Sequence, residues 1–178
     1  MSRPRLTASL AYWSSRTPDS VALECEGTTL TWRGLADSVE AVAYQLRDGG
    51  LAAGDRIGYL CENGAGVIQT ILAAAALDAI VVPLNVRLTT PELSWIVEDA
   101  GLSALLTDQA FADRSEELAR RHDLRFYWQG RRPRTGPRRW PGKARTRVSC
   151  CPGSPPPKTS RCSSATPRAR PAGPRVRC

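Results

Sequence analysis

Histidine is scarce in this sequence, and acidic residues are missing from its last third. It has one histidine among 178 residues, and no aspartate or glutamate follows Asp123. The six cysteines show neither metal-ligand spacing nor the Cys-x-x-Cys spacing of redox-active pairs. We therefore expect no metal site, and we interpret Cys25 and Cys61, which fall in predicted strands, as core thiols.

A long apolar segment is missing as well. The most apolar window, residues 67–84, is interrupted by Gln69, Asp78 and Pro83, whereas a membrane-spanning helix needs about 20 mostly apolar residues. The first residues are charged but lack the apolar segment of an export signal. We expect no membrane span and a cytoplasmic location.

Acidic and basic residues divide between two parts of the chain. Residues 1–128 carry 11 lysines and arginines against 17 acids, a net charge of −6, and residues 129–178 carry 14 and no acids, a net charge of +14. Ten of the 14 prolines also follow Gln129. A segment of this composition buries too little apolar surface to offset roughly 1–2 kcal/mol of backbone entropy per residue. We therefore predict an ordered domain over 1–128 and a disordered Arg/Pro-rich tail over 129–178.

Within residues 1–128 the hydrophobic pattern alternates between strand and helix. Glu26–Gly27 is typical of a hairpin turn, and Thr31 is typical of a helix cap because four apolar residues follow it with helical spacing: Leu35, Val39, Val42 and Leu46. Strands are predicted over 21–25, 28–31, 56–61, 80–84, 103–107 and 125–128, and further helices over 6–13, 64–77, 90–100 (capped by Thr90) and 111–122. This order indicates an α/β fold, with a partial, mostly parallel sheet and flanking helices.

Four stretches carry a family resemblance: RTPDSVAL at 16–23, LTWRGL at 30–35, GLAAGDRI at 50–57 and VVPLNVRL at 81–88. Their order and spacing resemble the adenylate-forming superfamily, which contains acyl-CoA synthetases, related AMP-dependent ligases and peptide-synthetase adenylation domains. The resemblance implies that residues 1–128 are the N-terminal part of the large domain of such an enzyme, truncated before the rest.

The resemblance also implies a reaction. Members activate a carboxylic acid, such as a fatty acid, with ATP to an acyl-adenylate and then pass the acyl group to CoA, so ATP, Mg²⁺ and CoA belong to the full-length family. Their phosphates are handled by a Ser/Thr/Gly-rich loop ending in Pro-Lys-Gly. The nearest strings, at 142–144 and 157–160, lack the surrounding glycines. We therefore expect no catalytic residue, no cofactor and no activity in this chain alone.

The resemblance leads to an expectation for each of two residues. Arg87 lies in a loop that could approach the CoA nucleotide, where a guanidinium suits phosphate; an exposed or carboxylate-paired arginine is the structural alternative. Asp78 stands where the family usually has glycine, so we expect a left-handed backbone there at a small cost in stability.

Two further patterns suggest function less strongly. Gly64-x-Gly66-x-x-Gln69 follows a predicted strand but lacks the third glycine of a dinucleotide-binding turn, which favours a plain turn capped by Asn63. His122 has no serine, cysteine or metal-type partner pattern, and a cation is favoured at the end of its predicted helix.

The basic tail has two interpretations. A shifted reading frame in a GC-rich gene, beginning near codons 124–132, explains its composition, and translating the other two frames tests this. Alternatively, a small α/β binding module presents a basic arm to nucleic acid or an acidic partner, with Trp140 available to stack on a base. We do not expect nucleic acid as the partner. We expect a carboxylic acid substrate in the full-length family, and a complementing chain that carries the remainder of the enzyme. The 125–128 strand should leave an uncovered sheet edge.

Overall fold

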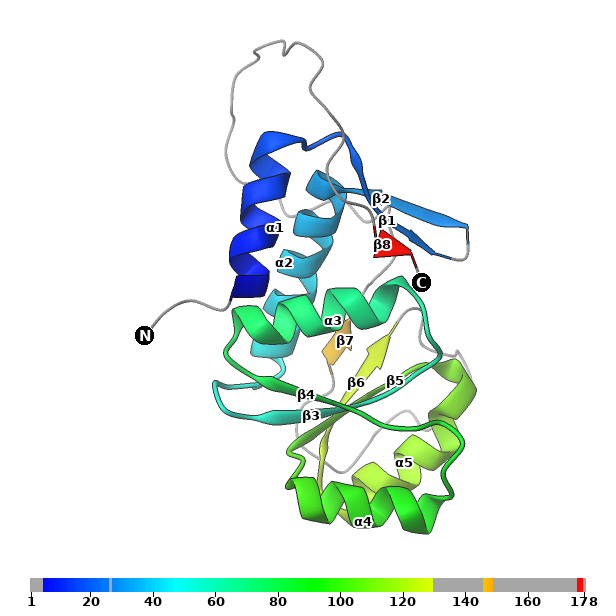
Figure 1. The fold of residues 1–178 in the computed structure, drawn as a ribbon. Coiled ribbons are helices and arrows are strands. Elements are labelled where there is room, and N and C mark those ends of the chain that lie inside the picture. The colour runs from blue at the N-terminus through cyan, green and yellow to red at the C-terminus, as the bar shows by residue number, and fades with distance from the viewer. Residues whose placement is uncertain (1–4, 26, 130–145, 149–175, 178) are drawn as a thin grey trace.

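The computed structural model describes residues 5–25, 27–129, 146–148 and 176–177 (Figure 1). A parallel sheet of five strands lies at its centre, in the spatial order β4-β3-β5-β6-β7. These strands are β3 (Arg56–Leu60), β4 (Ile80–Pro83), β5 (Ala104–Thr107), β6 (Arg125–Gln129) and β7 (Thr146–Val148). The α/β class and the mostly parallel sheet predicted from the sequence are confirmed.

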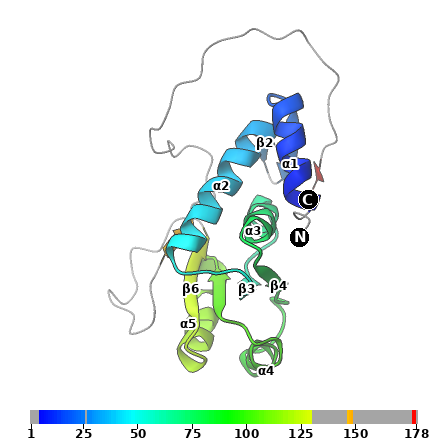
Figure 2. The same ribbon diagram turned by 90° about the vertical axis from the view of Figure 1, so that its left-hand side faces the viewer.

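Helices cover both faces of this sheet. Helices α2 (Trp32–Asp48) and α3 (Ala65–Ala76) lie over one face, and α4 (Thr90–Ala100) and α5 (Ala112–Arg121) lie over the other (Figure 2). Helix α1 (Arg5–Arg16) packs beside α2 and α3. The short 3-10 helix η1 (Gln109–Phe111) precedes α5.

Successive residues of each central strand face opposite layers, as strand geometry requires. Ile57, Leu106 and Tyr127 join the hydrophobic cluster under α2 and α3. Their neighbours Leu105 and Phe126 join the cluster over α4 and α5. The sheet is therefore covered on both faces, which accounts for the continuous apolar runs in the sequence.

A second, smaller sheet stands apart from the first. Strands β1 (Val21–Cys25) and β2 (Thr28–Thr31) form the predicted antiparallel hairpin, and β8 (Val176–Arg177) runs parallel to β1. Cys25 and Cys61 are buried thiols, as the sequence predicted.

Two short strands come from the segment that we predicted to be a disordered tail. Strand β7 pairs with β6, so the edge that we expected to be uncovered is occupied, because an open row of backbone N–H and C=O groups accepts an extended segment. The rest of the tail, with Trp140 and both lysine-containing strings, lies outside the described residues.

The helix starts test the predicted caps one by one. Thr31 caps α2, and its hydroxyl accepts a hydrogen bond from Gly34 N–H at 3.1 Å. The prediction that Thr90 caps α4 is wrong by one residue: Thr89 is the N-cap, because the Glu92 carboxylate reaches back to accept from Thr89 N–H at 2.7 Å. Asp78 has the expected left-handed backbone, with φ of 55°.

Candidate functional site

The carboxyl ends of β3, β4 and β5 lie at one edge of the sheet. From β3 the chain goes to β4 on one side and then, through α4, to β5 on the other side of β3. Ligands of open α/β sheets bind outside the carboxyl ends of strands at such a reversal. The loops after these three strands are therefore the first place to look for a site.

The carboxylate of Asp108 links the loops that follow β3 and β5. Asp108 accepts hydrogen bonds from Glu62 N–H at 2.7 Å and from Ala110 N–H at 2.9 Å. The backbone donor of Glu62 is therefore already used by an anion, and the Glu62 side chain adds a second negative charge to the loop. This arrangement disfavours a phosphate, in agreement with our rejection of a dinucleotide-binding turn.

The glycine pattern at the start of α3 serves packing. Gly64 is the N-cap and no side chain caps the helix, so the predicted cap at Asn63 is wrong: the helix begins at Ala65, one residue too late for Asn63 to be its cap. A Cβ atom at Gly66 would overlap the side chain of Gln129 at the end of β6. Gln69, where a dinucleotide turn would have its third glycine, is buried, and neither its amide nitrogen nor its amide oxygen has a hydrogen-bond partner among the described residues.

Arg87 lies in the loop after β4, and its side chain is exposed. Its backbone N–H donates to Asn85 Oδ1 at 3.0 Å. Arg114 holds the same loop, donating to the carbonyls of Leu88 at 2.6 Å and Val86 at 2.9 Å. The loop backbone is thus fixed from two sides, while the Arg87 guanidinium forms no ion pair with the described residues.

His122 has a serine partner that the sequence pattern did not reveal. Its Nε2 lies 2.6 Å from Ser94 Oγ on α4, and its Nδ1 lies 3.7 Å from a carboxylate oxygen of Glu98. Ser94 is 4% exposed, so a substrate cannot reach its hydroxyl. The group fastens the end of α5 to α4. The available signal was Ser94 itself, a polar residue beside Leu93 on the apolar stripe of α4.

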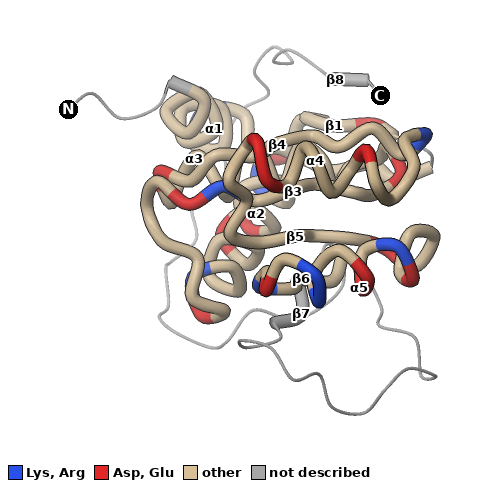
Figure 3. Tube along the Cα trace, turned by 90° about the horizontal axis from the view of Figure 1, so that it is seen from below, with Lys and Arg blue, Asp and Glu red and all other residues tan. Residues whose placement is uncertain are grey.

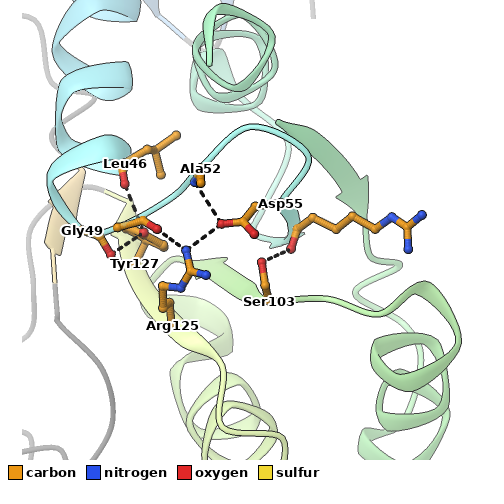
Figure 4. Close-up of polar contacts among 9 residues, drawn as sticks. Leu46, Gly49, Ala52, Asp55, Ser103, Arg125 and Tyr127 are labelled. Atoms are coloured by element: carbon orange, nitrogen blue, oxygen red, sulfur yellow. Dashed lines mark hydrogen bonds and ion pairs between the residues drawn. The ribbon is translucent and has the colours of Figure 1, made fainter. Parts of the chain in front are cut away.

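The opposite edge of the sheet, at the amino ends of the strands, holds a polar network (Figure 4). Arg125 forms a 2.7 Å ion pair with Asp55 and donates to the carbonyl of Gly50. The Tyr127 hydroxyl, at the centre of the same network, lies 3.1 Å from the carbonyl oxygen of Leu46 and 3.0 Å from that of Gly49. Ligand sites of such sheets lie at the other edge, so this network serves stability.

The network moves two pKa values in opposite directions. Burial disfavours the charged form of Asp55, but the hydrogen bond from Ala52 N–H together with the bond and charge of Arg125 outweigh it, so the pKa of Asp55 lies below its ordinary 3.8. Burial raises the pKa of Tyr127 above its ordinary value, against the opposing influence of Arg125.

An apolar hollow opens between α1, β1, α2 and α3. Its volume is about 260 Å³, and its lining includes Leu6, Leu10, Leu23, Trp32, Ile68 and Leu72. The indole nitrogen of Trp32 is buried away from solvent and has no hydrogen-bond partner among the described residues.

Other kinds of site were sought among the described residues. That part of the chain contains no group of three or more side chains able to hold a metal ion. None of its helices combines the length and apolarity needed to cross a bilayer. Acidic and basic residues are interspersed along it (Figure 3).

The fold and the loops at the carboxyl ends of the strands define the class of protein. It is an α/β domain with helices on both faces of its sheet and an exposed arginine on a fixed loop. The family of AMP-binding enzymes matches residues 10–140. The chain belongs to this family.

Relatives within the family are acid-activating ligases. A fatty acid–[acyl-carrier-protein] ligase of Streptomyces coeruleorubidus is 32% identical over 113 residues, which are 64% of this chain and 22% of that protein. A feruloyl-CoA synthase of an Amycolatopsis species is 36% identical over 102 residues, 57% of this chain and 21% of that protein. The chain thus spans about a fifth of the length of these relatives.

A solved structure agrees in fold. A protein described as a long-chain-fatty-acid CoA ligase from Rhodopseudomonas palustris superposes with a TM-score of 0.66 and 26% identity, over 70% of this chain and 32% of that one.

Proposed function

We propose that this chain is the N-terminal part of an ATP-dependent carboxylic acid–CoA ligase, and that it is inactive without the remainder of that enzyme. The observation that carries the proposal is the match of the family of AMP-binding enzymes to residues 10–140, while the relatives are matched over about a fifth of their length. The four-fifths of the relatives' length that this chain does not match would hold the phosphate loop and the acyl pocket.

Within that enzyme the chain acts as scaffold and supplies one ligand-binding residue. Arg87 fits a CoA phosphate because its guanidinium is exposed and unpaired with described residues, on a backbone fixed by Arg114 and Asn85. The junction closed by Asp108 does not fit a phosphate, so we place no part of ATP there. ATP with Mg²⁺, when bound by the remainder, would supply the leaving group that activates the acid.

Pyrophosphate exchange tests this proposal. The purified chain, given ATP with fatty and aromatic acids, should exchange no labelled pyrophosphate above background, because the adenylating residues are elsewhere. Exchange by the chain alone would refute the proposal. If a complementing chain restores exchange, the result would support the form of the proposal in which two chains together make up the enzyme.

Arg87 is tested in the restored enzyme. Arg87→Met should raise the KM for CoA about tenfold or more, since one charge-assisted phosphate contact is lost, and leave pyrophosphate exchange unchanged. Arg56→Met is the matched control, because Arg56 is also exposed but donates to the carbonyl of Ala100 at the far edge of the sheet. If both variants raise the KM for CoA equally, Arg87 is not part of the CoA-binding site.

The alternative function is a binding module with a basic arm, favoured only by the net charge of +14 over residues 129–178. Fluorescence polarisation with labelled single-stranded DNA and RNA distinguishes the two. We expect at most weak binding that is blind to sequence and lost at raised salt. Tight binding that persists at physiological salt would favour the arm.

A further inference from the structure

The two outermost strands of the folded domain's parallel sheet, β4 and β6, differ in how their open sides are protected. Strand β4 ends in Pro83, and a proline on an edge strand withholds a backbone donor from an approaching chain. Strand β6 has no such protection, since Phe126, Tyr127 and Trp128 follow one another without a charge or a proline. Aromatic residues favour strands, so β6 has the composition of a strand that pairs on both sides.

The second neighbour of β6 is β7, which comes from the basic tail. Its three residues pair with the last three of β6, with Tyr127 opposite Thr146 and Gln129 opposite Val148 (Figure 1). Strand β7 also lies against α2. Pairing of this kind uses backbone N–H and C=O groups. A segment too poor in apolar residues to form a core can therefore still supply a strand.

The tail covers the edge of the smaller sheet in the same way. Strand β8 pairs in parallel with β1, with Leu23 opposite Val176 and Glu24 opposite Arg177. It lies on the side of β1 that faces away from β2. Both described strands of the tail thus lie on a sheet edge, and the two edges belong to different sheets.

We propose that residues 146–148 are an edge-blocking segment, which occupies the open side of β6 and prevents this strand from pairing with β6 of a second copy of the chain. Without β7, the same edge of two copies meets across a two-fold axis, and the two β6 strands pair antiparallel. This role is separate from the proposed ligase function and does not depend on it.

The connection to β7 and the distribution of charge both favour the chain's own segment over a second copy. Parallel neighbours need a connection of about a dozen residues or more, and residues 130–145 supply 16. A connection this short gives the segment a local concentration of roughly millimolar. Residues 1–128 carry a net charge of −6 and residues 129–178 carry +14, so two domains repel each other while the tail is attracted to the domain.

Hydrogen exchange of the wild-type chain tests the pairing itself. Successive amides of a strand point to opposite neighbours, so β5 protects alternate amides of β6 and β7 protects the others. We expect the amides of Tyr127, Trp128 and Gln129 all to exchange slowly. Fast exchange of alternate amides in this stretch would show that the outer side of β6 is open, and would overturn the proposal.

Proline substitutions in the full chain remove the backbone donors of β7. Arg147→Pro removes the central donor, and the double variant Thr146→Pro with Val148→Pro removes the donors on either side of it. At least one variant must lose a bond to β6, because neighbouring amides point to opposite sides. One lost hydrogen bond weakens the intramolecular pairing about fivefold, and both copies must release β7, so the association constant in sedimentation should rise about 25-fold.

Arg161→Pro is the matched control, because it removes the same charge as Arg147→Pro and adds a proline to the tail outside both of its described strands. Its association should equal that of the wild type. All samples are kept under reducing conditions, since the chain has six cysteines. A synthetic peptide of residues 144–149, added at millimolar concentration, should reverse the association of the variants, and the same peptide with proline at positions 146 to 148 should not.

Three results of the sedimentation experiment would overturn the proposal. The first is an association constant that is the same for the wild type and both β7 variants. The second is association of Arg161→Pro as strong as that of the β7 variants. The third is association of the β7 variants that the 144–149 peptide leaves unchanged, since the associating surface would then not be the open side of β6.

Discussion

The polar network at the amino ends of the strands gives the sharpest test of what stabilises this domain. Arg125 and Asp55 are each 21% exposed in their side chains and lie 2.7 Å apart, so solvent screens this pair less than a surface pair. Arg125→Met keeps the length of the apolar stem but removes the bonds to Asp55 and Gly50. Hydrogen bonds to charged groups contribute about 1.5–3 kcal/mol, and we expect the free energy of unfolding to fall by that amount at pH 7.

The loss should depend on pH in a defined direction. The folded-state pKa of Asp55 lies below its ordinary 3.8, so its contribution is complete above the unfolded-state pKa and disappears as pH falls through the folded-state value. Without Arg125, burial still disfavours the carboxylate, and the pKa rises. The difference between wild type and variant should therefore be constant above about pH 5 and narrow below about pH 4.

Urea unfolding followed by tryptophan fluorescence from pH 3 to pH 8 measures this difference. Arg56→Met is the control: Arg56 begins β3 as Arg125 begins β6, but it donates to a carbonyl, that of Ala100 at 2.8 Å. Its effect should be only about 0.5 kcal/mol, because Arg56 is exposed to solvent. The effect should be flat with pH, because no carboxylate is involved. A loss for Arg125→Met that is equally flat, or no larger than that of the control, would refute the assigned ion pair.

Two further substitutions probe the backbone and the core by the same urea assay. Asp78→Gly should raise the free energy of unfolding by about 1 kcal/mol, because Asp78 has φ of 55° and glycine adopts this conformation without strain; a loss of stability would show that the Asp78 side chain contributes more than its backbone costs. Gly58→Ala should lower it by about 1–3 kcal/mol, since a Cβ there would lie 2.8 Å from Leu102 Cδ1 and 3.0 Å from Leu105 Cδ1; an unchanged value would mean that these leucines move aside freely.

The sequence predicted the local elements well because their signals are local. Helical spacing of Leu35, Val39, Val42 and Leu46 placed the buried face of α2, and all four are buried. The alternation of strands with helices gave the parallel sheet, and the strands pair in parallel. The two errors in helix caps, at Asn63 and Thr90, are shifts of one residue, the scale on which neighbouring capping signals compete.

Local sequence patterns could not predict contacts between residues that lie far apart in the sequence. Ser94 and His122 are 28 residues apart, and Asp108 meets the backbone of Glu62 across 46. Nothing in the spacing of Asp108 shows that it fills the junction between two loops. The unpaired state of Trp32 and Gln69 is likewise a property of the packed molecule, since burial and the absence of an acceptor both depend on neighbours brought by the fold.

The two edges of the sheet differ in how their charged and polar groups are paired. At the amino ends, the charge of Asp55 is balanced by Arg125, and the Tyr127 hydroxyl has carbonyl acceptors, so this edge is complete without another chain. At the carboxyl ends, where a ligand would bind, Asp108 already occupies the donor of Glu62, and Arg87 is the exposed cation on the β4 loop. One arginine can hold a phosphate group but cannot activate an acid, because adenylation needs several positioned charges around the reacting phosphate. Under the proposed function, the chemistry would come from residues that approach this edge from outside the described domain.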